Sequence, residues 1–411
     1  MSDKPDPAAA GPGPTERLYY DDPYLARFEA AVVERTLFEG RPALVLDRTA
    51  FYPESGGQPW DTGVIEGAAV VKVVEEDGRL LHVLDREVAA DRVTGRIDWP
   101  RRFDHMQQHT GQHILSQAFY ELVEGETLAF HLGEDFSTLE IGLASITDES
   151  LDRVEARANE VVWEDREVRC YYVEEEKIGE VPLRRPPKKH GLLRVVEVAG
   201  YDYSACGGTH CRRSGEVGLV KVTGQEKIRG RLRFQFLCGR RALLDYSLKN
   251  RELRRIGALF SSSWSGLAGL VEKQAAEARG LKRTAKKLEE ELFSYEAAGL
   301  AAAARGGVIV KSFEDRTPQG VRFLALSLTR QGRFCVVFGA RTEAQAHLIL
   351  ARHAELGLDL RDVVPAVSVA AVFKGGGGPS LVELVTAEKE KLPEAMKLAE
   401  SWVRERLESG A

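Results

Sequence analysis

Two short motifs that lie far apart in the chain place the strongest constraint on its fold. The first carries His109 and His113, and the second carries Cys206 and His210, each pair being four residues apart. The first pair lies in a stretch with helical apolar spacing, so both imidazoles project from one helix face. The second pair encloses two glycines, which favour a turn. A fold that unites the pairs offers three nitrogens and one sulfur, a set that suits tetrahedral Zn²⁺.

Two neighbouring side chains leave the choice of ligands open at this point. Cys211 directly follows His210 and competes with Cys206, although the glycines favour Cys206 by letting it bend toward the same ion as His210. His105 precedes His109 by four residues and is either a further ligand on the helix face or a group beside the site. We predict one Zn²⁺ per chain, bound by four residues: His109, His113, Cys206 and His210.

Length, charge and cysteine usage restrict the class of protein. The chain has 411 residues and a net charge of −6, so it is long enough for several domains and carries no overall signature of nucleic-acid binding. Its five cysteines lack the spacing of a disulfide framework, which favours a reducing compartment. No signal peptide and no apolar run of membrane-spanning length is evident. We therefore expect a cytoplasmic protein with no membrane contact.

The distribution of apolar residues and turn signals divides the chain into five segments. Short strands, including 43–46, 70–74 and 80–83, predict a small β-barrel, and Asp77-Gly78 predicts a hairpin turn. A helix over 100–120, a charged helix over 148–165 and intervening strands predict an α+β domain. Strands at 308–310, 323–326 and 334–338 alternate with helices in a small α/β domain. The predicted segments are a disordered tail (1–17), a barrel (18–98), a zinc domain (99–241), a helical segment (242–304) and a C-terminal domain (305–411).

The helical segment 242–304 carries an apolar stripe with two interpretations. Its apolar residues alternate at spacings of three and four, as in a coiled coil. The stripe either packs on its own domain or forms a homodimer together with the C-terminal domain. The sequence favours neither.

Further polar residues could line a substrate pocket. Thr49 precedes a glycine-rich stretch that contains Gly56, Gly57 and Gln58. The glycines expose backbone N–H groups to a ligand, and Gln58 offers a donor and an acceptor, but the same stretch could be only a turn. His131 is a candidate residue of the pocket wall. Walker A, GxSxG and Rossmann motifs are missing, so we do not expect ATP to bind.

Two basic clusters flank the second metal motif. The first precedes it and the second follows it, so both could contact the phosphates of a nucleic acid near the metal. A solvated surface is the simpler interpretation of any charge run. The candidate nucleic-acid-binding residues are Arg184, Arg185, Lys188, Lys189, Lys227, Arg229, Arg231 and Arg233.

These motifs resemble those of a known family. The two His/Cys motifs and residues 49–58 are similar to the editing domain of alanyl-tRNA synthetase, and more so to the freestanding AlaX trans-editing proteins. Residues 15–24 and 130–134 also resemble that family. The region after the helical segment, with glycines at 375–378, is similar to the DHH-associated C-terminal domain, which would make this a long AlaX type.

The resemblance implies a function in translation fidelity. A member of this family hydrolyses the ester that joins serine, or glycine, to tRNA(Ala), with Thr49 in the pocket bonding the serine hydroxyl. Because the chain begins directly at the barrel, we expect it to act in trans on mischarged tRNA(Ala).

Three alternatives stay open at this stage. Four protein ligands describe a closed zinc site, so either His210 or His113 yields to water or the metal only shapes the pocket. The chain could instead be a zinc-stabilised tRNA-binding module without hydrolytic activity. It could also edit another tRNA, such as seryl-tRNA(Thr).

Overall fold

The computed structural model describes residues 15–187, 190–314 and 316–409. Both strands and helices occur in the N-terminal and in the C-terminal part of these residues. The α+β class expected from the sequence is confirmed. The chain divides into two units, Met1–Arg255 and Ile256–Ala411. The first unit contains the candidate metal ligands.

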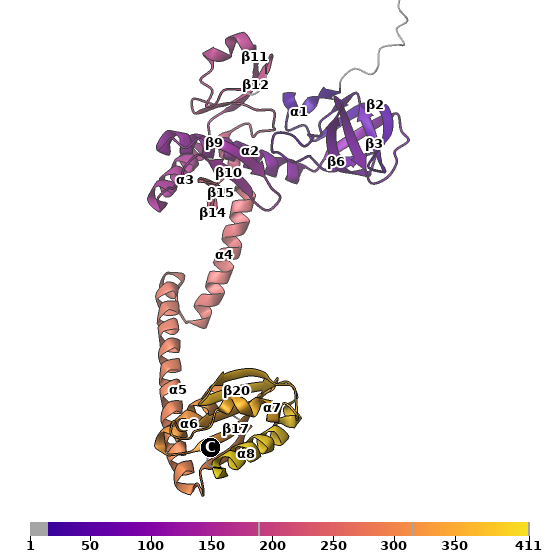
Figure 1. Cartoon of the computed structure of the whole chain (residues 1–411). Coiled ribbons are helices and arrows are strands. Elements are labelled where there is room, and N and C mark those ends of the chain that lie inside the picture. The colour runs from indigo at the N-terminus through magenta and orange to yellow at the C-terminus, as the bar shows by residue number, and fades with distance from the viewer. Residues whose placement is uncertain (1–14, 188–189, 315, 410–411) are drawn as a thin grey trace, which may run out of the picture. The chain divides into compact units, whose positions relative to one another are not determined.

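Six strands near the N-terminus pair in a closed ring, in the order β2-β3-β7-β6-β5-β8 (Figure 1). Closure leaves none of these strands with a free edge. Asp77 and Gly78 both have positive φ, 50° and 75°, and make the tight turn between β6 and β7. Phe28, Phe51 and Ile65 are among the residues of the barrel core. The strands are β2 (Arg27–Phe38), β3 (Arg41–Leu46), β5 (Gly63–Ile65), β6 (Ala68–Glu76), β7 (Arg79–Leu84) and β8 (Arg92–Ile97).

The N-terminal tail is shorter than the sequence indicated. Strand β1 (Glu16–Arg17) pairs in parallel with β4 (Arg48–Thr49), and α1 (Leu18–Asp21) follows it directly. The hydroxyl of Thr15 donates to the Leu46 carbonyl at 2.8 Å. The prediction of disorder up to residue 17 is therefore wrong for residues 16–17, because both residues pair with β4. Residues 1–14 lie outside the described part of the chain.

Helix α2 (Trp99–Val123) is the central element of the next layer and matches the predicted helix. Asp98 caps it, and Pro100 lies in its first turn. Gly111 lies inside this helix. A larger residue would not fit there, because a Cβ at this position would overlap the sulfur of Cys238. Around α2 lie α3 (Asp148–Trp163) and a sheet of order β14-β15-β10-β9, formed by β9 (Thr127–Leu132), β10 (Ser137–Ile141), β14 (Val220–Ile228) and β15 (Arg231–Cys238).

A second, three-stranded sheet carries the other half of the candidate site. Its order is β11-β12-β13, and all neighbours are antiparallel. Strand β13 ends one residue before Cys206. The strands are β11 (Val168–Val173), β12 (Leu193–Val198) and β13 (Asp202–Ala205), with the 3₁₀ turns η2 (Glu175–Glu180) and η3 (Ser214–Val217) nearby in sequence.

The helical segment consists of two helices, α4 (Gly239–Leu259) and α5 (Leu267–Ala303), with the short turn η4 (Trp264–Gly266) before α5. The break follows a change in backbone conformation at Ser261, whose φ is 51°. The Ser262 N–H then bonds the Gly257 carbonyl at 2.9 Å and closes the end of α4.

The second unit is built on a five-stranded sheet of order β16-β17-β18-β20-β19. Val337 and Phe338 of β17 belong to different buried clusters, one shared with α7 and α8 and the other with α5 and α6. Helices therefore cover both faces of the sheet (Figure 1). The elements are β16 (Val308–Phe313), α6 (Pro318–Gln331), β17 (Cys335–Arg341), β18 (Ala346–Arg352), η5 (Leu360–Val363), α7 (Val364–Val367), β19 (Lys374–Gly378), β20 (Leu381–Thr386), η6 (Lys389–Lys391) and α8 (Leu392–Glu408).

One predicted strand of this unit is a helix. Residues 323–326 lie inside α6, which Thr317 caps and Pro318 begins. Val321, Leu324 and Leu328 are fully buried at helical spacing, so a helix buries more apolar surface here than an isolated strand. The glycine run at 375–378 lies in the exposed edge strand β19.

Candidate metal centre

The two distant motifs meet in the first unit. His109 and His113 project from α2, while Cys206 and His210 lie in the loop after β13. Their candidate ligand atoms all lie within 4.8 Å of one another. The three histidines are 3% exposed or less. Three buried imidazoles and one half-buried thiol match the donor set of a zinc site.

The ring nitrogens that face the thiol are the Nε2 atoms. The Cys206 Sγ lies 3.4 Å from His109 Nε2 and 3.3 Å from His210 Nε2. The ring centroids of His113 and His210 are 4.7 Å apart. The imidazoles therefore surround the sulfur closely enough for a single ion to contact all four side chains.

An oxygen atom lies next to the other ring nitrogen of each histidine. His109 Nδ1 donates to Gln58 Oε1 at 2.9 Å, and His113 Nδ1 donates to Asp202 Oδ2 at 2.9 Å. His210 Nδ1 lies 3.3 Å from the Thr110 hydroxyl. Such partners fix the tautomer and orientation of metal-binding histidines. The arrangement leaves the Nε2 atom of each ring available to the cluster.

Asp202 is itself held in place by a buried arginine. Arg184 Nε donates to Asp202 Oδ1 at 2.7 Å, and the Ser204 hydroxyl donates to Oδ2 at 3.0 Å. The Arg184 side chain is only 8% exposed. The sequence-based proposal that Arg184 contacts tRNA is therefore not supported by its placement, because its guanidinium is directed inward to the metal centre.

Proximity changes the acid–base properties of these groups. Burial raises the pKa of the Cys206 thiol, but His109 and His210 outweigh it and hold that pKa well below its usual value. Burial, with the charge of His109 added, lowers the pKa of His210 to about 3. Burial opposes protonation of His113, yet Asp202 and Cys206 raise its pKa to about 9. Binding of a metal by His113 would therefore release a proton.

Gln58 connects the barrel to the metal-binding loop. Its Nε2 donates to the Thr209 hydroxyl at 2.8 Å, and its Oε1 accepts from the Thr209 N–H at 3.1 Å. Gly57 lies against Phe130, whose ring centroid is 5.5 Å from that of His109. Gly56 has open space around it. The glycine-rich stretch thus does more than turn the chain: it delivers Gln58 to His109.

Thr49 takes part in a separate buried network. Its hydroxyl lies 2.8 Å from His82 Nε2 and accepts from the Phe51 N–H at 3.1 Å. His82 Nδ1 lies 3.0 Å from the Leu44 carbonyl, which can only accept, so Nε2 carries no proton and Thr49 donates to it. One lone pair of the Thr49 hydroxyl stays available to a substrate donor.

The other predicted site residues lie outside the cluster. His131 is exposed, whereas its neighbour Phe130 contacts His109. Arg185 donates to the Thr127 carbonyl, and Arg231 and Arg233 pair with Glu140 at 3.3 Å and 2.6 Å. Lys227 and Arg229 are exposed and form no ion pair with other described residues. Lys188 and Lys189 lie outside the described residues.

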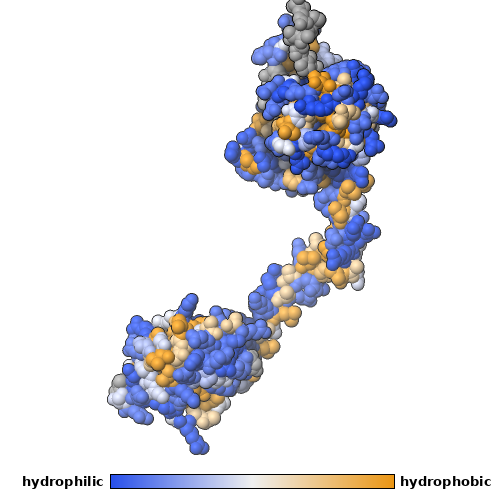
Figure 2. Space-filling model, turned by 90° about the vertical axis from the view of Figure 1, so that its right-hand side faces the viewer, coloured by the Kyte–Doolittle hydropathy of each residue, from blue (hydrophilic) through white to orange (hydrophobic). Residues whose placement is uncertain are grey.

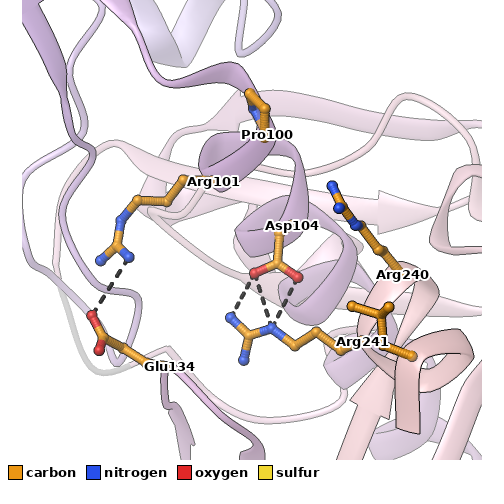
Figure 3. Close-up of a pocket in the computed structure, with 7 residues that line it drawn as sticks. Pro100, Arg101, Asp104, Glu134, Arg240 and Arg241 are labelled. Carbon is orange, nitrogen blue, oxygen red and sulfur yellow. Dashed lines mark hydrogen bonds and ion pairs between the residues drawn. The ribbon is translucent and has the colours of Figure 1, made fainter. Parts of the chain in front are cut away.

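A second polar site lies at the start of α2. Arg241 Nε donates to Asp104 Oδ1 at 2.9 Å, and Arg101 pairs with Glu134 at 3.5 Å (Figure 3). Arg240 lines the same cavity of about 300 Å³ without an interaction in that view. Asp104 thus neutralises part of the basic cluster at the start of α4.

Sequence reasoning did not find Asp202, Thr110, Thr209 or His82. Thr110 and Thr209 lie inside the two motifs, so their positions alone could have drawn attention to them. Asp202 precedes Cys206 by four residues and could have been noticed as a carboxylate near a ligand. No local pattern links His82 to Thr49.

Comparison with known proteins agrees with this geometry. Residues 193–234, which include Cys206 and His210, match the family described as "Threonyl and Alanyl tRNA synthetase second additional domain". Residues 13–101 match the family described as "tRNA synthetases class II (A)". Alanine–tRNA ligase of Ignicoccus hospitalis is 30% identical over 95% of this chain and 43% of its own length. Alanyl-tRNA editing protein AlaX-L of Pyrococcus horikoshii is 27% identical over 92% of this chain and 96% of its own. The chain is thus similar both to alanine–tRNA ligases and to an AlaX-L editing protein.

The two relatives differ in how much of their own length the chain matches. The chain spans less than half of the alanine–tRNA ligase but nearly all of the AlaX-L protein. The solved C-Ala domain of Aquifex aeolicus alanyl-tRNA synthetase is 23% identical over 23% of this chain and 91% of that domain, with a TM-score of 0.22, which is too low to establish a common fold. Among the described residues, no helix combines the length and apolar character needed to cross a membrane.

Proposed function

We propose that this chain is a zinc-dependent hydrolase that removes serine, and also glycine, from mischarged tRNA(Ala) in trans. One observation carries the proposal: three buried histidines and the half-buried Cys206 bring their ligand atoms within 4.8 Å of one another, while an oxygen atom lies beside each Nδ1. The AlaX-L relative is named an alanyl-tRNA editing protein, which supports the substrate class.

The residues of the cluster suit zinc. His109, His113, Cys206 and His210 would hold the ion, with Gln58, Asp202 and Thr110 fixing the imidazole orientations. When bound, zinc would supply electrostatic stabilisation of the negative charge that develops on the ester carbonyl. His113 and His210 are the two ligands that could yield to water. The Nδ1 contact of His210 is the longer one and its partner is a neutral hydroxyl, so His210 is held less firmly than His113.

Thr49 provides a basis for selecting serine. Its proton is used by His82, so it can only accept a hydrogen bond from the substrate. A serine hydroxyl can donate that bond and an alanine methyl group cannot. Thr49 is fully buried, so the substrate must displace the side chains that cover it.

The wider organisation of the molecule belongs to the same proposal. Lys227 and Arg229, at the tip of the β14–β15 hairpin, are exposed candidate phosphate contacts. We also propose a DHH-associated C-terminal domain at 305–411, the domain divisions given above, and a homodimer formed through the helical segment.

Deacylation assays test this function. We expect faster release of serine from seryl-tRNA(Ala) than of alanine from alanyl-tRNA(Ala), and much slower release from seryl-tRNA(Thr). Loss of a hydrogen-bond partner of a metal ligand typically lowers activity by roughly 10- to 100-fold. Cys206→Ala removes a ligand itself, so it should lower the deacylation rate by more than that. Cys170→Ala is the matched control, since Cys170 is an exposed cysteine outside the cluster.

The rival functions give different results in the same assay. Tight binding of tRNA without release of serine would identify a zinc-stabilised binding module. Equal rates on the two seryl-tRNAs would contradict specificity for tRNA(Ala).

A further inference from the structure

A buried arginine lies beside the metal-binding loop on the side of its carbonyl groups. Arg194 belongs to β12 and is 8% exposed. Its Nη1 donates to the carbonyls of Cys206 and Gly208, both at 2.9 Å, and its own carbonyl accepts from the Cys206 N–H at 3.0 Å. Arg194 is therefore fixed to the loop that presents the thiol ligand.

The other nitrogens of this guanidinium have no hydrogen-bond partner among the described residues. Neither Nε nor Nη2 forms a hydrogen bond, although both atoms are buried. No carboxylate of the described chain lies within ion-pair distance of Arg194. A buried charge with unsatisfied donors costs free energy and needs an explanation. Nε and Nη2 form the edge of a guanidinium that binds two oxygens of one phosphate side by side.

Two tyrosines are neighbours of Arg194. The ring of Tyr20 lies with its centroid 5.1 Å from the guanidinium carbon of Arg194. Tyr172 is the cross-strand partner of Arg194, so both side chains lie on the same face of the sheet. Tyr172 is 50% exposed, which leaves its ring open to a stacking partner. A cation flanked by aromatic rings is a common arrangement for binding single-stranded nucleic acid.

We propose that Arg194, Tyr20 and Tyr172 form the binding site for the 3′-terminal nucleotide of the substrate. Arg194 binds the 5′-phosphate of that nucleotide through Nε and Nη2, and Tyr172 stacks on its base. The inference rests on the proposed function and identifies where the nucleotide next to the scissile ester binds.

The 5′-phosphate is the group of the substrate that best suits the charge of Arg194. The aminoacyl ester has no free carboxylate, so the phosphodiester is the substrate's permanent anion. Arg194 contacts the carbonyl side of the loop, whereas the Cys206 sulfur is directed toward the histidines. One ribose separates the acyl group from the phosphate of the same nucleotide.

Calorimetry with two non-hydrolysable analogues tests the site in the full chain. Both carry serine in amide linkage at the 3′ position of adenosine, and only one carries a 5′-phosphate. For the natural sequence we expect the phosphate to tighten binding by about 10- to 100-fold, as for a charge-assisted bidentate contact. Arg194→Gln should reduce this ratio to about one, whereas Arg169→Gln, on the exposed neighbouring strand, should preserve it.

A second variant keeps the test valid if Arg194→Gln disturbs the loop. Tyr172→Ala should weaken binding of both analogues by about tenfold and leave the phosphate ratio unchanged, because only stacking is lost. A phosphate effect that survives Arg194→Gln in a folded protein would overturn the inference, and so would binding of both analogues with equal affinity. If the natural sequence bound neither analogue and released no serine from seryl-tRNA(Ala), the proposed function itself would fail.

Discussion

At the scale of single residues, the partners of the histidines decide how well the metal is held. Asp202 is a charged, buried partner of His113, with Arg184 on its other side. Loss of such a partner typically lowers metal affinity by about 10- to 100-fold. We expect Asp202→Asn to cause a loss in this range, because the amide retains the shape of the carboxylate without its charge.

Competition with a chromogenic zinc chelator measures this affinity. Asp91→Asn is the matched control, since Asp91 pairs with Arg35 on the surface of the barrel. Equal affinity of Asp202→Asn and the natural sequence would show that the contact does not support the site.

His82 makes the barrel sensitive to acid. Burial lowers the pKa of His82 to about 4, with the Leu44 hydrogen bond opposing this shift. An unfolded histidine titrates near 6.5, so the unfolded chain binds the proton more readily below that pH. The stability that depends on neutral His82 is complete above about pH 6.5 and falls as the pH drops toward 4.

Urea unfolding of the natural sequence and of His82→Gln, at pH 7 and pH 5, measures the effect. Between these values we expect the natural sequence to lose about 2 kcal/mol more than the variant, because glutamine does not titrate. Parallel losses in the two proteins would contradict a neutral buried His82.

The ligands could be predicted from sequence, and most of their partners could not. Regular spacing within two short motifs identifies the four ligands His109, His113, Cys206 and His210. The partners of Thr49 and Arg184 come from other elements, so their contacts depend on the tertiary fold. For this reason Arg184 was expected at a nucleic-acid surface but lies beside Asp202.

At the scale of elements, the metal-binding loop depends on one of its two glycines. A Cβ at Gly208 would overlap the His109 ring and come within 2.9 Å of Gln58 Oε1, whereas a Cβ at Gly207 would meet only Tyr20 Oη, at 3.5 Å. We expect Gly208→Ala to displace the loop and lower zinc affinity by at least about tenfold, more than Gly207→Ala does.

Zinc titrations of the two alanine variants form a matched pair in the same loop. Circular dichroism of each variant checks that the first unit stays folded. Similar affinities for both would show that the loop adjusts without cost.

Local patterns predicted the elements well where a single signal dominated. The hairpin at Asp77-Gly78 and helix α2 follow directly from turn chemistry and apolar spacing. Residues 323–326 were misassigned because a short apolar run fits a strand and a buried helix equally well. Strand β1 was missed because its pairing partner, β4, lies outside its own segment.

At the scale of the whole molecule, sequence indicated a mixed α+β chain but could not assign the surface of its longest helix. Helix α5 keeps many apolar side chains exposed, and apolar residues are visible along the helical segment in Figure 2. Leu281 and Leu288, one heptad apart, are 70% and 58% exposed. Exposed apolar residues in a heptad stripe are typical of a helix that pairs with a second copy.

We therefore expect the full chain to be a dimer and Leu281→Glu/Leu288→Glu to dissociate it. Each buried leucine contributes on the order of 2 kcal/mol, so the double substitution should raise the dimer dissociation constant by more than about 100-fold. Multi-angle light scattering over a concentration series measures the change. Arg283→Glu, an exposed residue two positions after Leu281 and on the side of the helix away from the stripe, should leave the dimer intact. A monomer at high concentration for the natural sequence would assign the stripe to another role.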